Sequence, residues 1–507
     1  MAPPNLLYYG DNLDVLRRHV EDESVDLIYL DPPFNSNQDY NVLFAEQDGT
    51  RSPAQIKAFG DTWRWDQAAA AAYRETVERG GQVSQVMQAF RTFLGENDVL
   101  AYLSMMAPRL LELQRVLKPT GSIYLHCDPT AGHYLKLLMD AVFGPENFRN
   151  EIVWHYRKWS TGKYAFQRNH DLLLFYSRSQ TRERAFNQLY MKRAASTEKR
   201  FGTSKIVSGY DEEGRRLPSQ MADEESQGVR QDDVWSIGRV PPVKQLFPTE
   251  KPRPLLERLI KASSNEGDVV LDPFCGCGTA VVSAQLMKRR WVGIDITHLA
   301  VNLIRHRLQD MFGSTIEREY SVVGEPVSLP DARALAAEDP YQFQWWALGL
   351  VGARPAAQKK GADKGIDGRI YFHDERNGAK TKQAILSVKA GRTGVQHLRD
   401  LRGVIDREGA QLGVLITMQD PTRDMRTEAA SADFYKSPWG QHPRLQLLTV
   451  EELLSGTRID MPPPGASITF KRADKAEAPT PENEELFSGE SRVDPAAEPS
   501  DQPGDPE

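Results

Sequence analysis

Two hydrophobic patterns alternate along the chain between its N-terminus and about residue 300. Short, continuous apolar runs are typical of buried β-strands, whereas longer stretches with an apolar residue every three to four positions predict amphipathic helices. The runs that predict strands lie at residues 6–10, 25–31, 122–128, 150–156, 171–177, 268–274 and 291–296. The stretches that predict helices lie at residues 11–20, 98–121, 130–144, 252–264 and 279–289. Strands that alternate with helices in this way predict an α/β fold built on a doubly wound sheet.

The same pattern divides the chain into units. Residues 177–245 are polar and irregular, without a clean period, and they interrupt the first unit. A second ordered unit starts near Leu335, and a segment rich in Pro and Glu starts near Ala473. Such a segment buries too little apolar surface to fold. We therefore expect a first domain at 1–325 with a region inserted at 155–248, a smaller α/β domain at 335–458, and a disordered acidic tail at 473–507.

Composition is that of an ordinary globular protein. Of the 507 residues, 40% are hydrophobic and 26% are charged, and no apolar run is long enough to cross a bilayer. The three cysteines are too few for a disulfide framework and lack the spacing of a zinc site; they are Cys127, Cys275 and Cys277. The N-terminus lacks the layout of a signal peptide. We expect a cytoplasmic protein with reduced thiols and no membrane partner.

Charge is spread unevenly along the chain. The segment from Ala473 onward has a net charge of −9, so the rest of the chain is at +2 although the whole is at −7. Residues 155–245 have a net charge of +6. A basic block in a nearly neutral body suits a polyanion such as nucleic acid, although a solvated loop region is the simpler explanation of the charge alone.

The stretch VVLDPFCGCGTAVVSA at residues 269–284 has the pattern of a nucleotide-binding turn. A buried strand ends at Asp272, Gly276 and Gly278 follow, and a helix is expected directly after them. Small residues let the backbone approach a ligand closely, and a helix N-terminus attracts negative groups. Asp295, at the end of the next predicted strand, is in position to bind ribose hydroxyls. The pattern predicts a nucleoside-cofactor site, although the third glycine of the dinucleotide-binding fingerprint is missing.

The tetrapeptide DPPF at residues 31–34 ends another predicted strand. Pro32 and Pro33 cannot continue that strand or a helix, so they hold the chain rigid directly after Asp31. In open α/β sheets, ligands bind beyond the carboxyl ends of the strands. A carboxylate, a fixed proline carbonyl and the ring of Phe34 together match a planar base that bears an exocyclic amine. A plain Asp-Pro-Pro turn is the alternative interpretation.

The two motifs, DPPF and DPFCGCGT, resemble those of the amino-methyltransferases of DNA, which use S-adenosylmethionine to methylate adenine N6 or cytosine N4. The catalytic motif precedes the cofactor motif, an order similar to that of the permuted beta group and of type III-like modification enzymes. The resemblance spans residues 5–310. Further matches are YYGDNLDVL at 8–16, DPPFNSNQDYNVLF at 31–44, LKPTGSIYLHCD at 117–128 and EKPRPLLERLI at 250–260.

The resemblance also implies roles for individual residues. The catalytic motif would be Asp31, Pro32, Pro33 and Phe34, and the cofactor would be bound by Asp11, Lys251, Pro252, Asp272, Phe274, Gly276, Gly278, Thr279 and Asp295. Within that set, Asp295 would hold the ribose hydroxyls and Asp11 the adenine amine of the cofactor. Cys277 stands where the family usually has serine, a small-for-small change. The insert at 155–248 would be the target recognition domain, with double-stranded DNA as the partner.

Asp at the first position of the catalytic motif is similar to the adenine-specific members, so adenine N6 is the expected target. A base inside a duplex must be flipped out to reach such a pocket, and Phe34 and Tyr40 are candidate stacking faces. Two alternatives stay open: a cytosine-N4 enzyme, and a methyltransferase of RNA or protein such as the related Asn-Pro-Pro-Tyr enzymes. A homodimer, a separate restriction subunit and a nucleoid location are compatible with this interpretation.

A third pattern lies in the second domain. The β-rich runs GADKGIDGRIYF and QAILSVKAG flank a polar turn and predict a hairpin. If that hairpin pairs Asp367 with Ser387 or Lys389, the three side chains share one face, and Asp367 becomes a candidate Mg²⁺ ligand. Residues 335–455 resemble the PD-(D/E)xK nuclease fold in its Mrr-type branch, which implies a fused endonuclease of a restriction–modification system. Ser387 replaces the Glu or Gln of that family, so a surface hairpin and an inactive DNA-binding relic stay open.

Some further residues fit a core better than a ligand site. Trp345 and Trp346 lie on one predicted helix, and Met105 and Met106 lie on another. His126, at a strand end, is expected to be a packed residue rather than a metal ligand.

Overall fold

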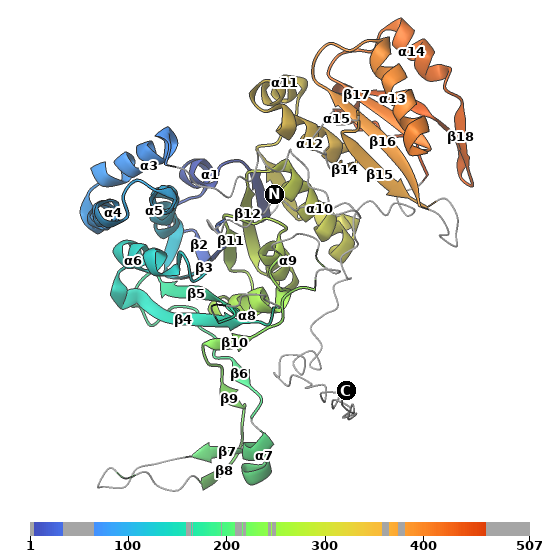
Figure 1. The fold of residues 1–507 in the computed structure, drawn as a ribbon. Helices are drawn as coiled ribbons and strands as arrows, with labels where there is room; N and C mark the ends of the chain where they lie inside the picture. The colour runs from blue at the N-terminus through green and yellow to red at the C-terminus, as the bar shows by residue number, and fades with distance from the viewer. Residues whose placement is uncertain are drawn as a thin grey trace, which may run out of the picture.

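The computed structural model contains two larger β-sheets covered by helices, and a slender arm (Figure 1). It describes residues 5–33, 65–158, 164, 166–193, 195–207, 215, 220–241, 245, 250–356, 365–373 and 381–462. Phe34, Tyr40 and the acidic segment from Ala473 lie outside the described residues. Among the described helices, none is long and apolar enough to cross a membrane.

The first sheet has nine strands in the order β10-β4-β5-β3-β2-β11-β12-β1-β13. Neighbouring strands pair in parallel except at β5, which runs antiparallel to both β3 and β4. This is the doubly wound α/β sheet that the alternating pattern predicted. Its strands are β1 (Asn5–Tyr9), β2 (Val25–Leu30), β3 (Leu117–Cys127), β4 (Phe148–His155), β5 (His170–Ser177), β10 (Val234–Ser236), β11 (Val269–Asp272), β12 (Arg290–Asp295) and β13 (Tyr320–Val323).

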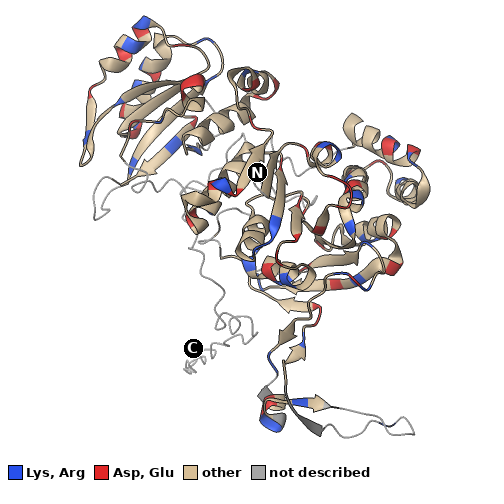
Figure 2. Cartoon of the chain, turned by 180° about the vertical axis from the view of Figure 1, so that it is seen from behind, with Lys and Arg blue, Asp and Glu red and all other residues tan. Residues whose placement is uncertain are grey.

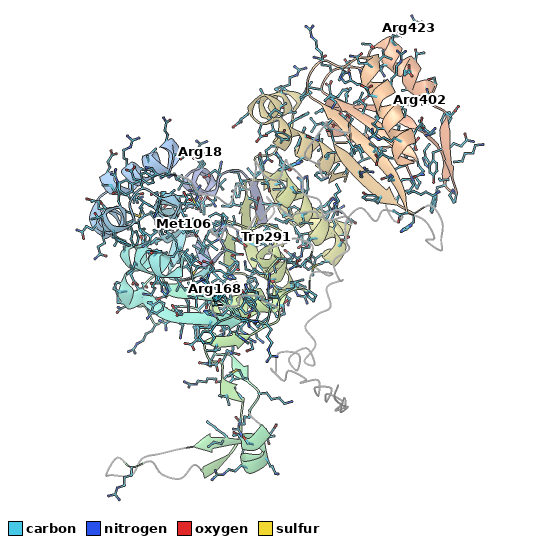
Figure 3. All side chains as sticks on the ribbon, viewed as in Figure 1. Arg18, Met106, Arg168, Trp291, Arg402 and Arg423 are labelled. Carbon is cyan, nitrogen blue, oxygen red and sulfur yellow. The ribbon has the colours of Figure 1, made fainter. Side chains whose placement is uncertain are left out.

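Each face of this sheet packs against its own set of helices. Met106 belongs to the core on one face and Trp291 to the core on the other, and both are buried (Figure 3). Burying a large apolar side chain contributes about 1.5–3 kcal/mol, so the two cores stabilise the packing of the sheet between the helices. The helices of the first core are α1 (Asn12–His19), α3 (Gln67–Glu78), α4 (Gly81–Leu94), α5 (Asp98–Val116) and α6 (Gly132–Phe143), and those of the second are α8 (Arg253–Ser263), α9 (Thr279–Leu286) and α10 (His298–Phe312).

One predicted boundary is wrong. The helix predicted at 98–121 ends at Val116, because Leu117 already pairs with Val25 at the start of β3. Lys118 donates to both carboxylate oxygens of Asp26, at 2.7 and 2.8 Å, and this ion pair fixes the early start of the strand. The Pro-Thr-Gly signal that was expected to stop a helix therefore lies inside β3.

The arm leaves the first sheet between β5 and β10 (Figure 1). It contains β6 (Tyr190–Met191), α7 (Ala195–Phe201), β7 (Ser204–Val207), β8 (Gln220–Glu225) and β9 (Val229–Arg230). Strand β6 pairs antiparallel with β9, and β7 pairs antiparallel with β8. These elements correct the expectation of irregular chain, because segments this short cannot display a hydrophobic period. Basic side chains gather on α7, with Lys199 and Arg200 in its last turn (Figure 2).

The second sheet has five strands in the order β14-β15-β16-β17-β20. Strands β15 and β16 pair antiparallel, which confirms the predicted hairpin. Trp345 and Trp346 are 3% and 2% exposed, so their predicted core position is confirmed. The strands of this unit are β14 (Arg354–Pro355), β15 (Gly368–Phe372), β16 (Lys382–Lys389), β17 (Leu412–Thr417), β18 (Phe434–Ser437), β19 (Gly440–Pro443) and β20 (Leu445–Thr449). Its helices are α11 (Leu329–Glu338), α12 (Pro340–Leu350), α13 (Val395–Glu408), α14 (Arg423–Ala430) and α15 (Val450–Leu454).

Candidate functional site

The carboxyl ends of β1, β2, β3, β11 and β12 meet at one edge of the first sheet, because these strands are parallel. We call this edge, with the residues directly after each strand, the carboxyl edge. Asp31 follows β2, Asp272 ends β11 and Asp295 ends β12. Since β2 and β11 are neighbours, the two sequence motifs lie side by side although they are far apart in the chain.

Asp31 has two ionisable neighbours. Lys251 Nζ forms an ion pair with Asp31 Oδ2, and the two side chains are 16% and 19% exposed. His126 Nδ1 lies 3.8 Å from Asp31 Oδ1. Pro32 is buried and Pro33 is half-buried. Lys251 was expected to bind the cofactor. In the structure it forms an ion pair with Asp31, the carboxylate that was expected to bind the target amine.

His126 is the centre of a buried polar chain. Its side chain has no exposed surface, Nδ1 lies 3.0 Å from the Tyr29 hydroxyl, and Nε2 lies 3.4 Å from Asp171 Oδ2. The Tyr156 hydroxyl donates to Asp171 Oδ1 at 3.0 Å. Burial alone would raise the pKa of Asp171, but the hydrogen bond and charge of His126 outweigh burial and lower it. His126 is packed, as expected, but it also links three polar side chains, which its sequence context does not reveal.

The glycine loop between β11 and α9 has a backbone that only glycine adopts easily. Gly276 and Gly278 have φ of 48° and 74°. A Cβ atom on Gly278 would lie 2.7 Å from Ile304 Cγ1, closer than atoms pack. The amide of Gly276 donates to Asp295 Oδ2 at 2.9 Å, and Thr279 begins α9. The loop therefore offers bare backbone and a helix N-terminus at the carboxyl edge, as a nucleoside cofactor requires.

The acids beside this loop are buried. Burial raises the pKa of Asp295 to about 6, and burial also raises the pKa of Asp272 well above its usual value. Asp295 Oδ1 accepts from the backbone N–H and the hydroxyl of Thr297, at 2.9 and 2.8 Å. Together with the Gly276 amide on Oδ2, these bonds use most of the carboxylate's acceptor capacity. The contact of Asp295 with a ribose stays a prediction. Phe274, also assigned to the cofactor, donates its amide to Asp272 Oδ1 at 3.1 Å.

Asp11 is shared between a helix cap and an ion pair. Its Oδ1 accepts from the Leu13 amide at 2.8 Å, and its Oδ2 accepts from Arg109 Nη2 at 2.6 Å. Arg109 Nε donates to Asn12 Oδ1 at 2.6 Å, and Asn12 Nδ2 donates to the Pro273 carbonyl at 2.8 Å. Sequence reasoning missed Arg109, and a basic residue among the apolar positions of a predicted helix was the available signal.

A second arginine, Arg307 of α10, contacts the glycine loop and the start of α9. Arg307 and Glu250 form an ion pair at 2.9 Å, with side chains 7% and 6% exposed. Arg307 Nη1 donates to the Cys277 carbonyl and to Thr279 Oγ1, both at 3.2 Å. Glu250 directly precedes Lys251, while Pro252 caps α8, so this one ion pair links the glycine loop to the segment that reaches Asp31. Sequence reasoning missed Arg307 as well, because its partner is set by the fold.

The three residues singled out in the second domain do come together. One oxygen of Asp367, Oδ2, accepts from the Ser387 hydroxyl at 3.1 Å, the Val388 amide at 2.7 Å and Lys389 Nζ at 3.5 Å. The Asp367 side chain is 7% exposed. Within the described ranges, no three His, Cys, Asp or Glu side chains gather as metal ligands do. The predicted shared face is confirmed, and the Mg²⁺ site stays a prediction.

Two family models match the chain. A model described as DNA methylase, of the N6/N4 type, matches residues 25–306. A model described as NACHT-associated inactive Restriction Endonuclease 1 matches residues 341–455. The first match spans Asp31, the arm and the glycine loop, and the second spans the five-stranded sheet.

Individual relatives match more than half of the chain. The type II methyltransferase M.HpaI of Haemophilus parainfluenzae is 26% identical over 298 residues, which are 58% of this chain and 71% of that protein. The DNA adenine methyltransferase YhdJ of Escherichia coli K12 is 25% identical over 305 residues, 60% of this chain and 82% of that protein. The solved PvuII DNA methyltransferase, described as cytosine-N4-specific, is 13% identical, covers 60% of this chain and 88% of its own, and gives a TM-score of 0.34. At that score the likeness adds nothing to the strand order described above.

Proposed function

Because this chain belongs to the N6/N4 family of DNA methylases, which take their methyl group from S-adenosylmethionine, we propose that its target is the N6 amine of adenine in double-stranded DNA. The observation that carries the proposal is Asp31, a carboxylate at the end of β2 beside the strand that leads into the glycine loop. Aspartate at this position resembles the adenine-specific members of the family. The match to a protein named a DNA adenine methyltransferase supports the same target.

Asp31 and a carbonyl of the two prolines would accept the two amine hydrogens. That arrangement localises the lone pair on the amine nitrogen, which is otherwise delocalised into the ring. The cofactor, when bound, would supply an electrophilic methyl group. The glycine loop would hold it through backbone groups that no side chain shields, with Asp295 as the acceptor nearest to a ribose.

The inserted region at 155–248 would recognise the DNA sequence. Its arm carries two basic side chains on a short helix, Lys199 and Arg200, which suit phosphate contacts. Phosphate contacts position a protein on DNA, whereas base contacts specify the sequence, so the arm would set the register in which the rest of the region reads bases.

The five-stranded unit would contact DNA without cutting it. Asp367 Oδ2 already accepts three donors of the protein, and Ser387 offers a neutral hydroxyl where a nuclease would hold a metal with a carboxylate. The matching family model is itself named inactive. Incubation of methylated and unmethylated plasmid with Mg²⁺ tests this assignment. Cleavage by the wild type that is lost in Asp367→Ala and Lys389→Ala would contradict this assignment and support the predicted endonuclease activity.

The target is tested by methyl transfer from labelled S-adenosylmethionine to duplex DNA, RNA and protein, followed by separation of the nucleosides. We expect label in N6-methyladenine of DNA and none with Asp31→Ala. Label in N4-methylcytosine would contradict the choice of base. Label only in RNA or protein would contradict the choice of substrate.

A further inference from the structure

Methylation of an exocyclic amine produces one proton that must leave the carboxyl edge. The nitrogen lone pair forms the bond to the methyl carbon, the methyl–sulfur bond breaks with its electron pair on sulfur, and the nitrogen is left with one hydrogen too many. This inference rests on the proposed function, in which Asp31 is the first group to meet that hydrogen. A second acceptor beside Asp31 would free the carboxylate of that proton before the methylated base leaves.

The described residues offer one such acceptor behind Asp31. His126 Nδ1 lies 3.8 Å from Asp31 Oδ1, whereas the other oxygen is taken by Lys251, whose ammonium group cannot accept a proton. A distance of 3.8 Å is longer than a hydrogen bond. Catalytic hydrogen bonds are commonly long in ligand-free proteins and shorten in the reacting complex.

Asp171 prepares His126 for a positive charge. Its Oδ2 lies 3.4 Å from His126 Nε2, and the Tyr156 hydroxyl holds the other oxygen at 3.0 Å. A carboxylate on the far nitrogen of an imidazole fixes the ring and stabilises the imidazolium, as the aspartate of a Ser-His-Asp triad does. The ring also lies edge-on to Trp154, with centroids 5.5 Å apart, which leaves it little freedom to turn.

Asp171 decides which ring nitrogen is basic. Its lowered pKa keeps it ionised, and a carboxylate can only accept, so the hydrogen of the neutral ring is on Nε2, 3.4 Å from Asp171 Oδ2. Nδ1 then accepts from the Tyr29 hydroxyl at 3.0 Å, which stays protonated because burial, with the charge of Asp31 adding to it, raises the pKa of Tyr29 well above its usual value. The lone pair is therefore on the nitrogen that faces Asp31. Once Nδ1 is protonated, the Tyr29 hydroxyl can rotate and accept instead.

We propose that His126 is the temporary store of the proton released by the target amine. The proton passes from the amine nitrogen to Asp31 Oδ1 and on to His126 Nδ1, where the imidazolium lies between the carboxylates of Asp31 and Asp171. After the methylated base leaves, the proton returns through Asp31, whose side chain is 19% exposed, to water, and the starting tautomer is restored. His126 touches neither base nor cofactor in this scheme, so it is a positioning residue that acts through Asp31.

The charged and titratable groups around His126 come from β2, β5 and the segment before α8. Tyr29 and Asp31 belong to β2 and its end, Asp171 belongs to β5, and Lys251 precedes α8. Tyr156, after β4, reaches His126 only through Asp171. Because the carboxylates of Asp31 and Asp171 and the ammonium of Lys251 surround the ring, each test variant removes one group and leaves the others.

The kinetic test measures single-turnover methyl transfer as a function of pH. His126→Gln keeps an amide that can donate to Asp171 but cannot store a proton. We expect transfer to be slowed about ten-fold near neutral pH, with the deficit shrinking as pH rises because hydroxide takes over as acceptor. Affinities for cofactor and DNA should not change. His442→Gln is the matched control, since His442 is 6% exposed and pairs with Asp460 at 2.7 Å in the other unit.

The second test observes the His126 ring by NMR and does not depend on methyl transfer. In DNA-free protein, the ¹⁵N spectrum of the His126 ring should change in Asp31→Asn and in Asp171→Asn, because each removes a carboxylate that lies beside one of the two ring nitrogens. Asp460→Asn should leave it unchanged. This NMR experiment decides the inference even if His126→Gln fails to fold. It also decides the inference if the chain methylates no adenine, a result that would contradict only the proposed function. A ring spectrum that is indifferent to Asp31, or a His126→Gln pH profile parallel to that of the wild type, would overturn the proton store.

Discussion

The pair of Asp31 and Lys251 lies partly buried, so each charge depends on the other. We expect Asp31→Ala to abolish methyl transfer and to leave cofactor affinity intact, because Asp31 serves the amine. The same change leaves Lys251 without its counter-ion, so the free energy of unfolding should fall by about 1–3 kcal/mol. Transfer assays, calorimetry with S-adenosylmethionine and chemical denaturation measure the three effects.

Asp22→Ala is the control for that variant. Asp22 also pairs with a basic residue, Arg115, but its side chain is 73% exposed, so its loss should cost little stability and no activity. A folded Asp31→Ala protein that lost cofactor affinity together with transfer would remove Asp31 from the target side of the site.

Asp295 should make cofactor binding depend on pH. Its pKa of about 6 means that the carboxyl loses its charge as pH falls through 6, and a protonated carboxyl is a poorer acceptor for ribose hydroxyls. Calorimetry should therefore show weaker binding of S-adenosylmethionine below that pH in the wild type, and no such step in Asp295→Asn. A pH-independent wild type would argue that Asp295 only shapes the glycine loop.

Stability of the ligand-free protein should show the opposite trend. The folded-state pKa of Asp295 lies above the ordinary value of 3.8, so its contribution to the free energy of unfolding is fully present below pH 3.8 and is lost as pH rises through 6. Bound cofactor would offset that loss. Denaturation across this window, with and without cofactor, separates the two effects.

Some site residues were predictable from sequence because the residues next to them in the chain form a recognisable pattern. Asp31 is followed by two prolines, and Gly276 and Gly278 stand between a strand and a helix, patterns that few other structures explain. His126 and Asp171 are 45 positions apart and meet through the neighbouring strands β3 and β5, while Lys251, just before α8, is 220 positions from Asp31, so only the fold brings these partners together. Arg109 and Arg307 were missed for the same reason.

At the level of elements, the turn from β11 into α9 depends on one glycine. Gly278 precedes the first residue of α9 with a left-handed backbone, and α10 fills the space where a side chain would go. We expect Gly278→Ala to lower the free energy of unfolding by more than the roughly 1–2 kcal/mol of the backbone alone, and to weaken cofactor binding. Thermal denaturation and calorimetry measure both.

Gly267→Ala supplies the comparison. Gly267 also has a positive φ, of 86°, but a Cβ atom there would meet nothing within 4 Å. Its variant isolates the backbone cost and should bind cofactor normally. Equal losses in the two variants would mean that contact with Ile304 contributes nothing.

At the scale of the whole molecule, the proposed function assigns DNA contacts to the arm and the chemistry to the carboxyl edge. Replacing residues 192–228 with a two-residue turn that joins β6 to β9 should leave cofactor affinity unchanged and weaken DNA binding. Each lost phosphate contact lowers the slope of log affinity against log salt by about 0.9, so the slope should shrink with the basic residues removed. DNA binding measured over a salt series checks this, and an unchanged slope would exclude phosphate contacts by the arm.

The two ends of the arm are neighbours. Tyr190 pairs with Arg230 and Met191 with Val229, so the chain leaves and returns at almost one point. An insert whose ends already meet adds little loop-closure entropy to the host, and that entropy grows only with the logarithm of insert length. Lineages can therefore exchange, lengthen or shorten this segment while the folding of the sheet stays the same. The way the chain is placed on DNA could then change by module exchange, with the carboxyl edge inherited unchanged.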